Sequence, residues 1–343
     1  MMICREFQTT DRAAWDQFVH THPMGSPFHL MAWRDTLREN FSYKPKYRVA
    51  VDQGRIVGVL PLFLVDNIVT GAVLISTPFA VYGGILAESE AAHEALRNHV
   101  RAMAEELDVE YLDLRNQFAN QSIGAEAVDR YSTFTRSVGP SDQASVLAAL
   151  PQKTRNVVRK SLKFPFQMRA AQNLDNFYKL MLHTYRRLGT PAFPKAFFES
   201  IVRNFGAMVD VREVWLEGRA VAVSLNFLFG QSMHTYYAAS DDDVWAMGPN
   251  NYMYFEHLLW AGNHGFRVFD FGRSKKGTGP YSFKKNFGAT EHPMPYEIML
   301  VNRLDMPNFT PTNPKFDLAA KVWRKIPLPV TKMLGPQLIG LFP

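Results

Sequence analysis

Residues 266–288 read FRVFDFGRSKKGTGPYSFKKNFG, and this stretch decides how the rest of the chain is interpreted. The apolar run 266–271 predicts a short strand, and the glycines after it predict a loop that carries Arg273 and Lys276. An aromatic and basic segment, 281–287, comes next. Because an open α/β sheet usually holds its ligand where a strand ends, the cations of this loop predict a site for anions.

The composition is that of a folded, soluble chain. Its 343 residues, 47% hydrophobic and 20% charged, predict about two domains. A net charge of +6 fits an enzyme that handles phosphorylated or nucleic-acid partners, but it also fits many proteins without such a role. The single Cys4 excludes internal disulfides and cysteine-based zinc sites, and residues 1–8 lack the pattern of a signal peptide. We therefore expect a cytoplasmic protein.

Two parts of the chain repeat one pattern. Residues 54–64 (GRIVGVLPLFL) and 218–228 (GRAVAVSLNFL) share a turn glycine, an arginine, valines and a Phe-Leu pair at the same spacing. Farther along, the strand-like segment around Asp113 is echoed by the one around Asp270. A glycine turn between apolar runs predicts a hairpin, and two matches in the same order predict a duplicated α/β domain. The alternative is two unrelated hairpin-plus-helix units.

A basic segment, residues 151–163, lies between the two repeats. On a helix, Arg155 and Arg159 are four positions apart and share one face. No acidic residue interrupts the cations of this segment. It predicts either contacts with phosphate or nucleic acid, or a solvated basic edge of a helix.

Several common catalytic motifs are missing from the sequence. It contains no phosphate-binding loop of the Gly-x-x-x-x-Gly-Lys type, no dinucleotide fingerprint after a strand, no His-Glu-x-x-His and no Gly-x-Ser-x-Gly. The ten histidines are scattered, and His257 and His264 are interpreted as packing residues. We therefore expect no metal site.

The C-terminal half resembles the signature of the FemABX aminoacyltransferases. The matching residues are Gly248-Pro249-Asn250, Phe269-Asp270-Phe271-Gly272, Phe283-Lys284 and Phe287-Gly288, with support from Tyr82-Gly83-Gly84 nearer the start. The resemblance covers about residues 1–302, and the Phe-Asp-Phe-Gly-Arg-Ser-Lys form is similar to the branch that accompanies exosortase and exopolysaccharide gene clusters.

This resemblance implies an α/β fold of two tandem GNAT-like domains, each a mixed sheet flanked by helices. We place the N-terminal domain at 1–140 and the C-terminal domain at 141–304, with an active-site loop at 270–288. A basic and apolar tail, 305–343, lies beyond the family core. We expect the tail to pack on the body; the alternative is contact with an anionic membrane surface at the inner face.

The resemblance also implies an activity, the transfer of an aminoacyl or acyl group to an amine on a cell-envelope precursor such as peptidoglycan or exopolysaccharide. The implied partners are a phosphorylated small molecule or lipid-linked glycan as acceptor, and aminoacyl-tRNA. No bound cofactor and no DNA are expected. The turn at 246–250 (AMGPN) has a single glycine and a proline where GNAT enzymes cradle the pyrophosphate of acyl-CoA, so we favour aminoacyl-tRNA as the donor.

Lys284 is the first catalytic candidate, because the family's Phe-Lys pair implies a lysine that faces the reacting carbonyl or the donor phosphate. The alternative is a surface lysine beside Lys285. Asp270 is interpreted as a base or as an anchor for the following loop. The remaining candidates are assigned to binding substrate, its anions and its phosphates: Arg273, Lys276, Tyr281, Phe283, Tyr237, Arg155 and Arg159.

Three other functions stay open at this point. One is an acyl-CoA-dependent GNAT N-acetyltransferase, and a second is a non-catalytic module that binds phosphorylated glycans. The third, a protein that binds single-stranded nucleic acid, has the least support, because it needs interleaved aromatics and Tyr236-Tyr237 is the only adjacent tyrosine pair.

Overall fold

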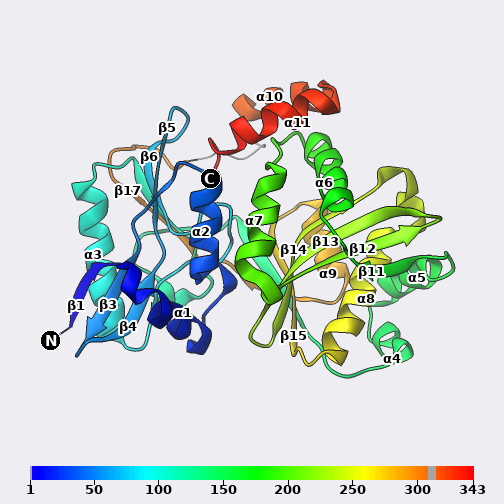
Figure 1. Cartoon of the computed structure of the whole chain (residues 1–343), viewed down its shortest axis with the longest axis horizontal. Coiled ribbons are helices and arrows are strands. Elements are labelled where there is room, and N and C mark those ends of the chain that lie inside the picture. Colours follow the sequence, from blue (N-terminus) through cyan, green and yellow to red (C-terminus); the bar gives the residue numbers. More distant parts are fainter. Residues whose placement is uncertain (1, 308–313) are drawn as a thin grey trace. The chain divides into compact units, whose positions relative to one another are not determined.

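A computed structural model describes residues 2–307 and 314–343 of the chain (Figure 1). The chain forms two compact units. Unit 1 comprises Met1–Arg130, Met294–Thr310 and Leu338–Pro343, and unit 2 comprises Tyr131–Pro293 and Pro311–Gln337. The division differs from the predicted domains, because residues 294–304 return to unit 1 instead of ending the second domain.

Unit 1 contains two sheets, with strand orders β1-β3-β4-β7 and β2-β5-β6-β8-β17-β9. Its strands are β1 (Ile3–Glu6), β2 (Lys44–Pro45), β3 (Arg48–Asp52), β4 (Arg55–Leu60), β5 (Phe63–Asn67), β6 (Gly71–Ile75), β7 (Leu86–Ala87), β8 (Tyr111–Leu114), β9 (Glu126–Val128) and β17 (Tyr296–Leu300). Its helices are α1 (Arg12–Thr21), α2 (Met31–Asn40) and α3 (Glu90–Glu106), with short turns η1 (Thr9–Asp11), η2 (Pro27–His29) and η3 (Ala119–Gln121).

Unit 2 has one seven-stranded sheet of order β11-β12-β13-β14-β15-β10-β16. Its strands are β10 (Tyr131–Ser137), β11 (Gln167–Ala170), β12 (Val209–Leu216), β13 (Arg219–Phe229), β14 (Ser232–Ser240), β15 (Val268–Lys275) and β16 (Thr290–Pro293). Its helices are α4 (Gln143–Ala148), α5 (Gln152–Ser161), α6 (Asp175–Leu188), α7 (Lys195–Phe205), α8 (Pro249–Asn263), α9 (Gly279–Asn286), α10 (Pro314–Lys325) and most of α11 (Leu328–Ile339), with turns η4 (Gly206–Met208) and η5 (Asp242–Met247).

The two predicted hairpins are present and share their details. Each turn has two residues with positive φ, a non-glycine followed by Gly54 or Gly218, as a type I′ turn requires. Each hairpin also has a register shift at the same place, between Ala50 and Val51 in β3 and between Val214 and Trp215 in β12. A shared turn type could arise twice independently, but a shared bulge at the same distance from the turn confirms the duplication.

A long helix connects two parallel strands in both units. In unit 1, α3 connects β6 to β8, which pair in parallel up to Ile75 and Asp113. In unit 2, α8 connects β14 to β15, which pair in parallel up to His234 and Asp270. The two aspartates singled out in the sequence therefore occupy equivalent positions.

The repeats differ at one strand. In unit 2, β13 runs unbroken through a register shift between Leu225 and Asn226. The equivalent positions in unit 1 are Pro61 and Leu62, and there the chain leaves one sheet and enters the other. Because proline has no N–H to donate to a strand ladder, Pro61 accounts for a complete break where unit 2 has only a bulge.

Each unit is completed by one strand from the other half of the sequence. Strand β10 follows the unit 1 strands along the chain, yet it pairs between β15 and β16 of unit 2. Strand β17 follows the unit 2 strands, yet it pairs between β8 and β9 of unit 1. The two sheets thus exchange equivalent strands.

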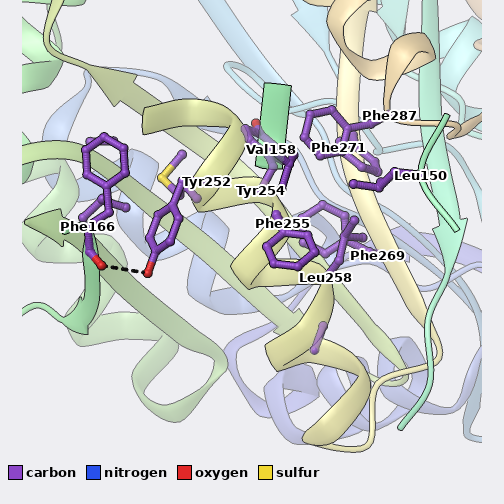
Figure 2. Packing of buried hydrophobic residues seen from close by; sticks show 14 of the residues in the cluster. Leu150, Val158, Phe166, Tyr252, Tyr254, Phe255, Leu258, Phe269, Phe271 and Phe287 are labelled. Carbon is purple, nitrogen blue, oxygen red and sulfur yellow. Dashed lines mark hydrogen bonds between the residues drawn. The ribbon is translucent and has the colours of Figure 1, made fainter. Parts of the chain in front are cut away.

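An aromatic cluster forms the core of unit 2 (Figure 2). The ring of Tyr254 on α8 stacks on Phe271 of β15, with centroids 5.5 Å apart. Phe269, two positions earlier on β15, packs in the same cluster. Since side chains alternate along a strand, the apolar residues at 269 and 271 direct Asp270 toward the opposite face of the sheet.

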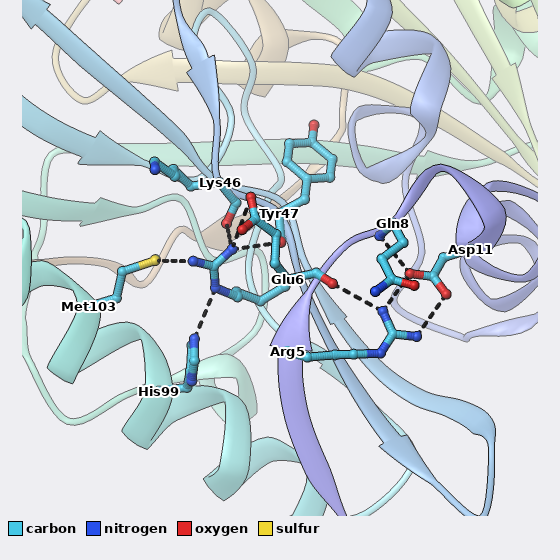
Figure 3. A network of polar contacts seen from close by, with 9 residues as sticks. Arg5, Glu6, Gln8, Asp11, Lys46, Tyr47, His99 and Met103 are labelled. Atoms are coloured by element: carbon cyan, nitrogen blue, oxygen red, sulfur yellow. Dashed lines mark hydrogen bonds and ion pairs between the residues drawn. The ribbon is translucent and has the colours of Figure 1, made fainter.

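A buried guanidinium links β3 to α3 in unit 1 (Figure 3). The Nε of Arg48 donates to Nε2 of His99 at 2.9 Å, and one terminal nitrogen lies 2.9 Å from Sδ of Met103. Another terminal nitrogen donates to the carbonyl oxygens of Lys46 and Tyr47. These partners satisfy a charge that would be costly to bury alone.

The predicted loop after residue 271 is wrong in detail. Strand β15 continues to Lys275, because its partner β10 pairs with it as far as Tyr131. Residues 279–286, predicted only as an aromatic and basic segment, form α9. Among the residues that the structure describes, no helix is long and apolar enough to cross a membrane.

Glu297 of β17 gives a test of the exchanged strand. Its buried carboxylate accepts hydrogen bonds from Asn116 Nδ2 at 3.0 Å, from the Ile123 N–H at 2.8 Å and from the Ser122 hydroxyl. Glu297→Gln places an amide NH₂ among these donors, so we expect a loss of about 2–4 kcal/mol in the free energy of unfolding, measured with urea.

Glu126→Gln is the matched control, because Glu126 is exposed on the adjacent strand β9 and should change stability by less than about 0.5 kcal/mol. Equal stabilities of the two variants would contradict the anchoring role of Glu297.

Candidate active site

The candidate site begins where β14 and β15 separate. Both strands lie wholly within the described residues, and they form three parallel pairs that end at His234 and Asp270. Beyond this pair β14 continues to Ser240 beside β13, and β15 continues to Lys275 beside β10. Carboxyl ends of parallel strands that separate are a common place for ligands in α/β folds, because backbone groups there are not used within the sheet.

Asp270 ties together the groups around this point. Its Oδ1 accepts a hydrogen bond from the Gly272 N–H at 2.6 Å and one from the Thr133 hydroxyl at 3.4 Å. Its Oδ2 lies 3.6 Å from Nδ1 of His234. Burial lowers the pKa of His234, although the carboxylate of Asp270 opposes this shift. Asp270 therefore does anchor the chain that follows it.

Lys284 on α9 reaches back to the end of β15. Its side chain is buried, and Nζ donates to the carbonyl oxygens of Gly272 at 2.9 Å and Arg273 at 2.8 Å. Burial lowers the pKa of Lys284 to about 7, with the carboxylate of Asp270 acting against this shift and the cation of Arg273 adding to it. The alternative of a surface lysine is wrong.

A bulge in β15 makes the double contact of Lys284 possible. Successive carbonyls of a regular strand point in opposite directions, so one ammonium group would not reach two in a row. Here the register with β10 shifts by one residue at Phe271, and Gly272 has a φ of +73°. This left-handed backbone brings two consecutive carbonyls to the same Nζ.

The position of Gly272 also has no room for a larger side chain. A Cβ at this position would lie 2.7 Å from Nε2 of His234. The imidazole of His234 therefore packs directly against the glycine backbone, and the same residue meets a steric and a conformational demand.

Arg273 on β15 and Tyr281 on α9 both precede Lys284 in the sequence and are held by different partners. The guanidinium of Arg273 lies 4.4 Å from the ring centroid of Tyr131, in a cation–π contact. The hydroxyl of Tyr281 donates to Glu291 at 2.7 Å, and the hydroxyl of Ser132 donates to the same carboxylate at 2.7 Å. Both contacts attach the turn and α9 to β10 and β16.

The other aromatic candidates occupy the core or the opposite strand. Phe283 packs against Tyr254 and Phe287 in the unit 2 cluster. Tyr237 lies on β14, beyond His234, where its ring contacts Phe198 of α7. Its hydroxyl is buried and has no hydrogen-bond partner among the described residues.

The basic candidates outside α9 are more exposed. Lys276 is exposed in the turn after β15, and Arg159 is exposed on α5. Arg155 is half-buried and donates from Nε and from one terminal nitrogen to the carbonyl oxygen of Leu150. The structure thus groups Arg273 with Lys284 and Asp270, and places Arg155 and Arg159 on a separate helix.

The start of α8 packs against α5. Gly248 and Pro249 are buried, and a Cβ built at Gly248 would lie 3.5 Å from Ser161 and 3.7 Å from Val157 of α5. The loop before it carries three aspartates, 241–243, which line a cavity of about 530 Å³.

In unit 1, the position equivalent to the candidate site is occupied by an arginine. Beside Asp113, the buried guanidinium of Arg115 donates to the carbonyl oxygens of Thr77 and Ala80 at 2.9 and 3.1 Å. Arg115 also lies 3.4 Å from the Asp113 carboxylate. The end of β8 is therefore tied to the loop after β6.

Sequence reasoning missed four residues of the site: Thr133, His234, Gly272 as a steric requirement, and Glu291. No spacing in the sequence connects His234 or Thr133 to Asp270, since they come from strands far apart along the chain. The position of Gly272 directly after the predicted strand, 266–271, was a sequence signal for a special backbone conformation there. In the part of the chain that is described, no cluster of histidine, cysteine or carboxylate side chains is arranged to hold a metal ion.

Residues 144–285 match the family model described as "Acetyltransferase (GNAT) domain", a span that includes Asp270 and Lys284. No curated protein matches the sequence. The family model and a similar tandem structure show the fold, which consists of two tandem GNAT-like domains.

Among solved structures, the chain is similar to FemX, with a TM-score of 0.65, 15% identity, and coverage of 87% of this chain and 97% of FemX. It is also similar to L-PGS from Bacillus licheniformis (TM-score 0.52, 12% identity, 92% and 97% coverage). A third similar structure is a tandem GNAT protein from the clavulanic acid biosynthesis pathway, with a TM-score of 0.52 and 12% identity. The match covers 89% of this chain and 99% of that protein. At these identities the likeness concerns the fold.

The contact between Gly272 and His234 can be tested with a pair of glycine variants. Gly272→Ala adds a left-handed alanine and a clash with a buried ring, so we expect a loss of about 2–4 kcal/mol in the free energy of unfolding. Gly277→Ala has a similar φ of +76° but nothing within 4 Å of its Cβ, so it should cost only about 1–2 kcal/mol. Equal losses in urea unfolding would contradict the packing of His234 against Gly272.

Lys284 should make stability depend on pH. Its pKa is about 7 in the folded protein and 10.5 in the unfolded chain, so between these values the unfolded chain binds a proton that the folded protein has released. The free energy of unfolding therefore rises with pH from about 7 to 10.5. We expect urea unfolding of Lys284→Met to lack this contribution.

Lys285→Met serves as the control, because Lys285 is the exposed neighbour on the same helix. If Lys284→Met and Lys285→Met keep the same pH dependence as the wild type, the ammonium group of Lys284 is not held in a desolvated site.

Proposed function

We propose that this protein is an N-acyltransferase that transfers an aminoacyl or acyl group to an amine on a cell-envelope or exopolysaccharide precursor. The observation that carries the proposal is the amine of Lys284, fixed by two carbonyl oxygens next to Asp270 where β14 and β15 separate. The match of residues 144–285 to the GNAT domain model supports acyl transfer. The fold of FemX supports the FemAB-like interpretation.

In this mechanism the acceptor amine attacks the donor carbonyl carbon and forms a tetrahedral oxyanion. Two N–H groups of protonated Lys284 are already directed at Gly272 and Arg273, and the third is assigned to the oxyanion. A donor held in place before the reaction stabilises charge that develops only in the transition state. The bond to the leaving oxygen then breaks as the carbonyl re-forms.

The attacking nitrogen must lose a proton during transfer. We assign this proton to the pair of Asp270 and His234, because the two side chains lie 3.6 Å apart and the lowered pKa of His234 leaves a neutral imidazole that can accept it. The same pair then returns this proton to the leaving oxygen. Arg273 is assigned to an anion of the substrate, and Tyr237 to a polar group of the ligand.

The donor we propose is aminoacyl-tRNA. The usual cradle for the pyrophosphate of acyl-CoA needs free backbone N–H groups at a helix start. Here that position is occupied by buried Gly248 and Pro249, and the aspartates 241–243 lie nearby. The acceptor would be a phosphorylated or lipid-linked glycan, with Arg155, Arg159 and Lys276 available for its phosphates. With such an acceptor, we propose that the protein acts in the cytoplasm, at the inner face of the membrane, as a member of the exosortase-associated branch that the sequence resembles.

The proposal is tested by transfer of a radiolabelled amino acid from aminoacyl-tRNA to an amine of a lipid-linked or nucleotide-linked envelope precursor. Lys284→Ala should lower kcat about 100- to 1000-fold, as loss of one oxyanion donor does. Arg273→Ala should mainly raise KM, because uniform binding of an anion is lost. The wild-type kcat should fall as pH rises through about 7, since the proposed donor is the ammonium form.

Lys285→Ala is the control and should keep wild-type turnover. Wild-type turnover in Lys284→Ala would remove the catalytic assignment, and a rate that rises above pH 7 would make Lys284 a base instead. Low-micromolar binding of acetyl-CoA in calorimetry would replace the proposed donor and favour an acyl-CoA-dependent N-acetyltransferase.

A further inference from the structure

Helices α10 and α11 carry a surface that the proposed acyl transfer does not use. The inner side of α10 packs on α6: Ala320 and Trp323 are buried, and the Ile326 carbonyl oxygen accepts a hydrogen bond from Arg186 at 2.6 Å. The inner side of α11 is fixed as well, since a Cβ added at Gly335 would lie only 2.7 Å from the backbone of Ala192. Both helices are thus held by one side (Figure 1).

The opposite side of these helices carries exposed apolar side chains among lysines. Leu318 and Val322 lie one turn apart on α10 and are 68% and 54% exposed. Both project away from the packed side, because they are separated from Ala320 by about half a turn of helix. On α11, Met333 is 63% exposed. We call Leu318, Val322 and Met333 the outer face.

The outer face is surrounded by cations. Lys321, Lys325 and Lys332 are exposed, whereas the guanidinium of Arg324 donates to the Leu188 carbonyl oxygen at the end of α6. Asp317 is the single acidic residue between positions 317 and 337. Its carboxylate lies 2.7 Å from Nζ of Lys321. Three cations and one carboxylate leave a net charge of +2 around the outer face.

We propose that the outer face docks on an anionic lipid surface. Its apolar side chains would enter the boundary between headgroups and acyl chains, while the lysines contact lipid phosphates. A protein partner fits less well, because the centres of protein interfaces are depleted in lysine and need a broad packed surface. The sequence predicted that the tail either packs on the body or contacts a membrane. Under this proposal, one side of the two helices packs on the body and the other side contacts the membrane.

The test is co-sedimentation of the full chain with lipid vesicles. Vesicles with about one third phosphatidylglycerol in phosphatidylcholine should bind the protein, and pure phosphatidylcholine vesicles should not. The double variant Leu318→Asn/Val322→Asn should bind at least about tenfold more weakly, since the apolar anchor is lost. Lys325→Gln and Lys332→Gln should each weaken binding about fivefold, and high salt should do the same.

Ile68→Asn is the matched control, because Ile68 is 96% exposed in the turn between β5 and β6 and follows an acidic residue, Asp66, instead of a basic cluster. It should leave vesicle binding unchanged. Absence of wild-type binding, or equal binding by the double variant, would overturn the proposal. Sedimentation velocity that shows a dimer abolished by the double variant, without vesicle binding, would make the outer face a contact between copies. None of these readouts involves acyl transfer, so failure here leaves the proposed activity untouched.

Discussion

The separation of two parallel strands after only three residue pairs is the constraint on which the candidate site depends. Once β15 leaves β14 at Asp270, its backbone also bonds to the Asp270 carboxylate and to Lys284, while β10 continues to pair with its other edge. The contact of Lys284 with two consecutive carbonyls uses the left-handed backbone of Gly272. A glycine, a carboxylate and a lysine therefore form one unit, in which the lysine is desolvated because the strand end closes around it.

The duplication shows two uses of one strand geometry. In unit 2 the aspartate at the end of the parallel pair supports a lysine whose pKa is close to neutrality. In unit 1 the equivalent aspartate lies beside Arg115, which donates to backbone carbonyls of the loop after β6. Because a guanidinium keeps its charge at any accessible pH and satisfies several acceptors at once, it suits a structural role better than proton transfer. The same architecture thus holds a buried lysine in one copy and a buried arginine in the other.

Local patterns predicted the repeated elements well and the site only in part. The glycines at 54 and 218 predicted both hairpins, because a type I′ turn needs positive φ angles and strongly favours glycine. The family resemblance directed attention to Lys284. The extension of β15 and the pairing of Asp270 with His234 and Thr133 could not be predicted, since these contacts depend on β10 and β14, and strand pairing over long distances leaves no local trace. Helix α9 was missed because its glycine and proline at the start resembled a loop.

The exchange of β10 and β17 has a consequence for how the protein is made. Asn116 and Glu297, joined by a hydrogen bond in unit 1, are 181 positions apart, with almost all of unit 2 between them. A ribosome must therefore synthesise the chain past residue 300 before the sheet of unit 1 can close, whereas multidomain chains usually fold their N-terminal domain first. Until then the edges of β8 and β9 lack their partner strand, and the nascent N-terminal half has to be kept from pairing with other chains.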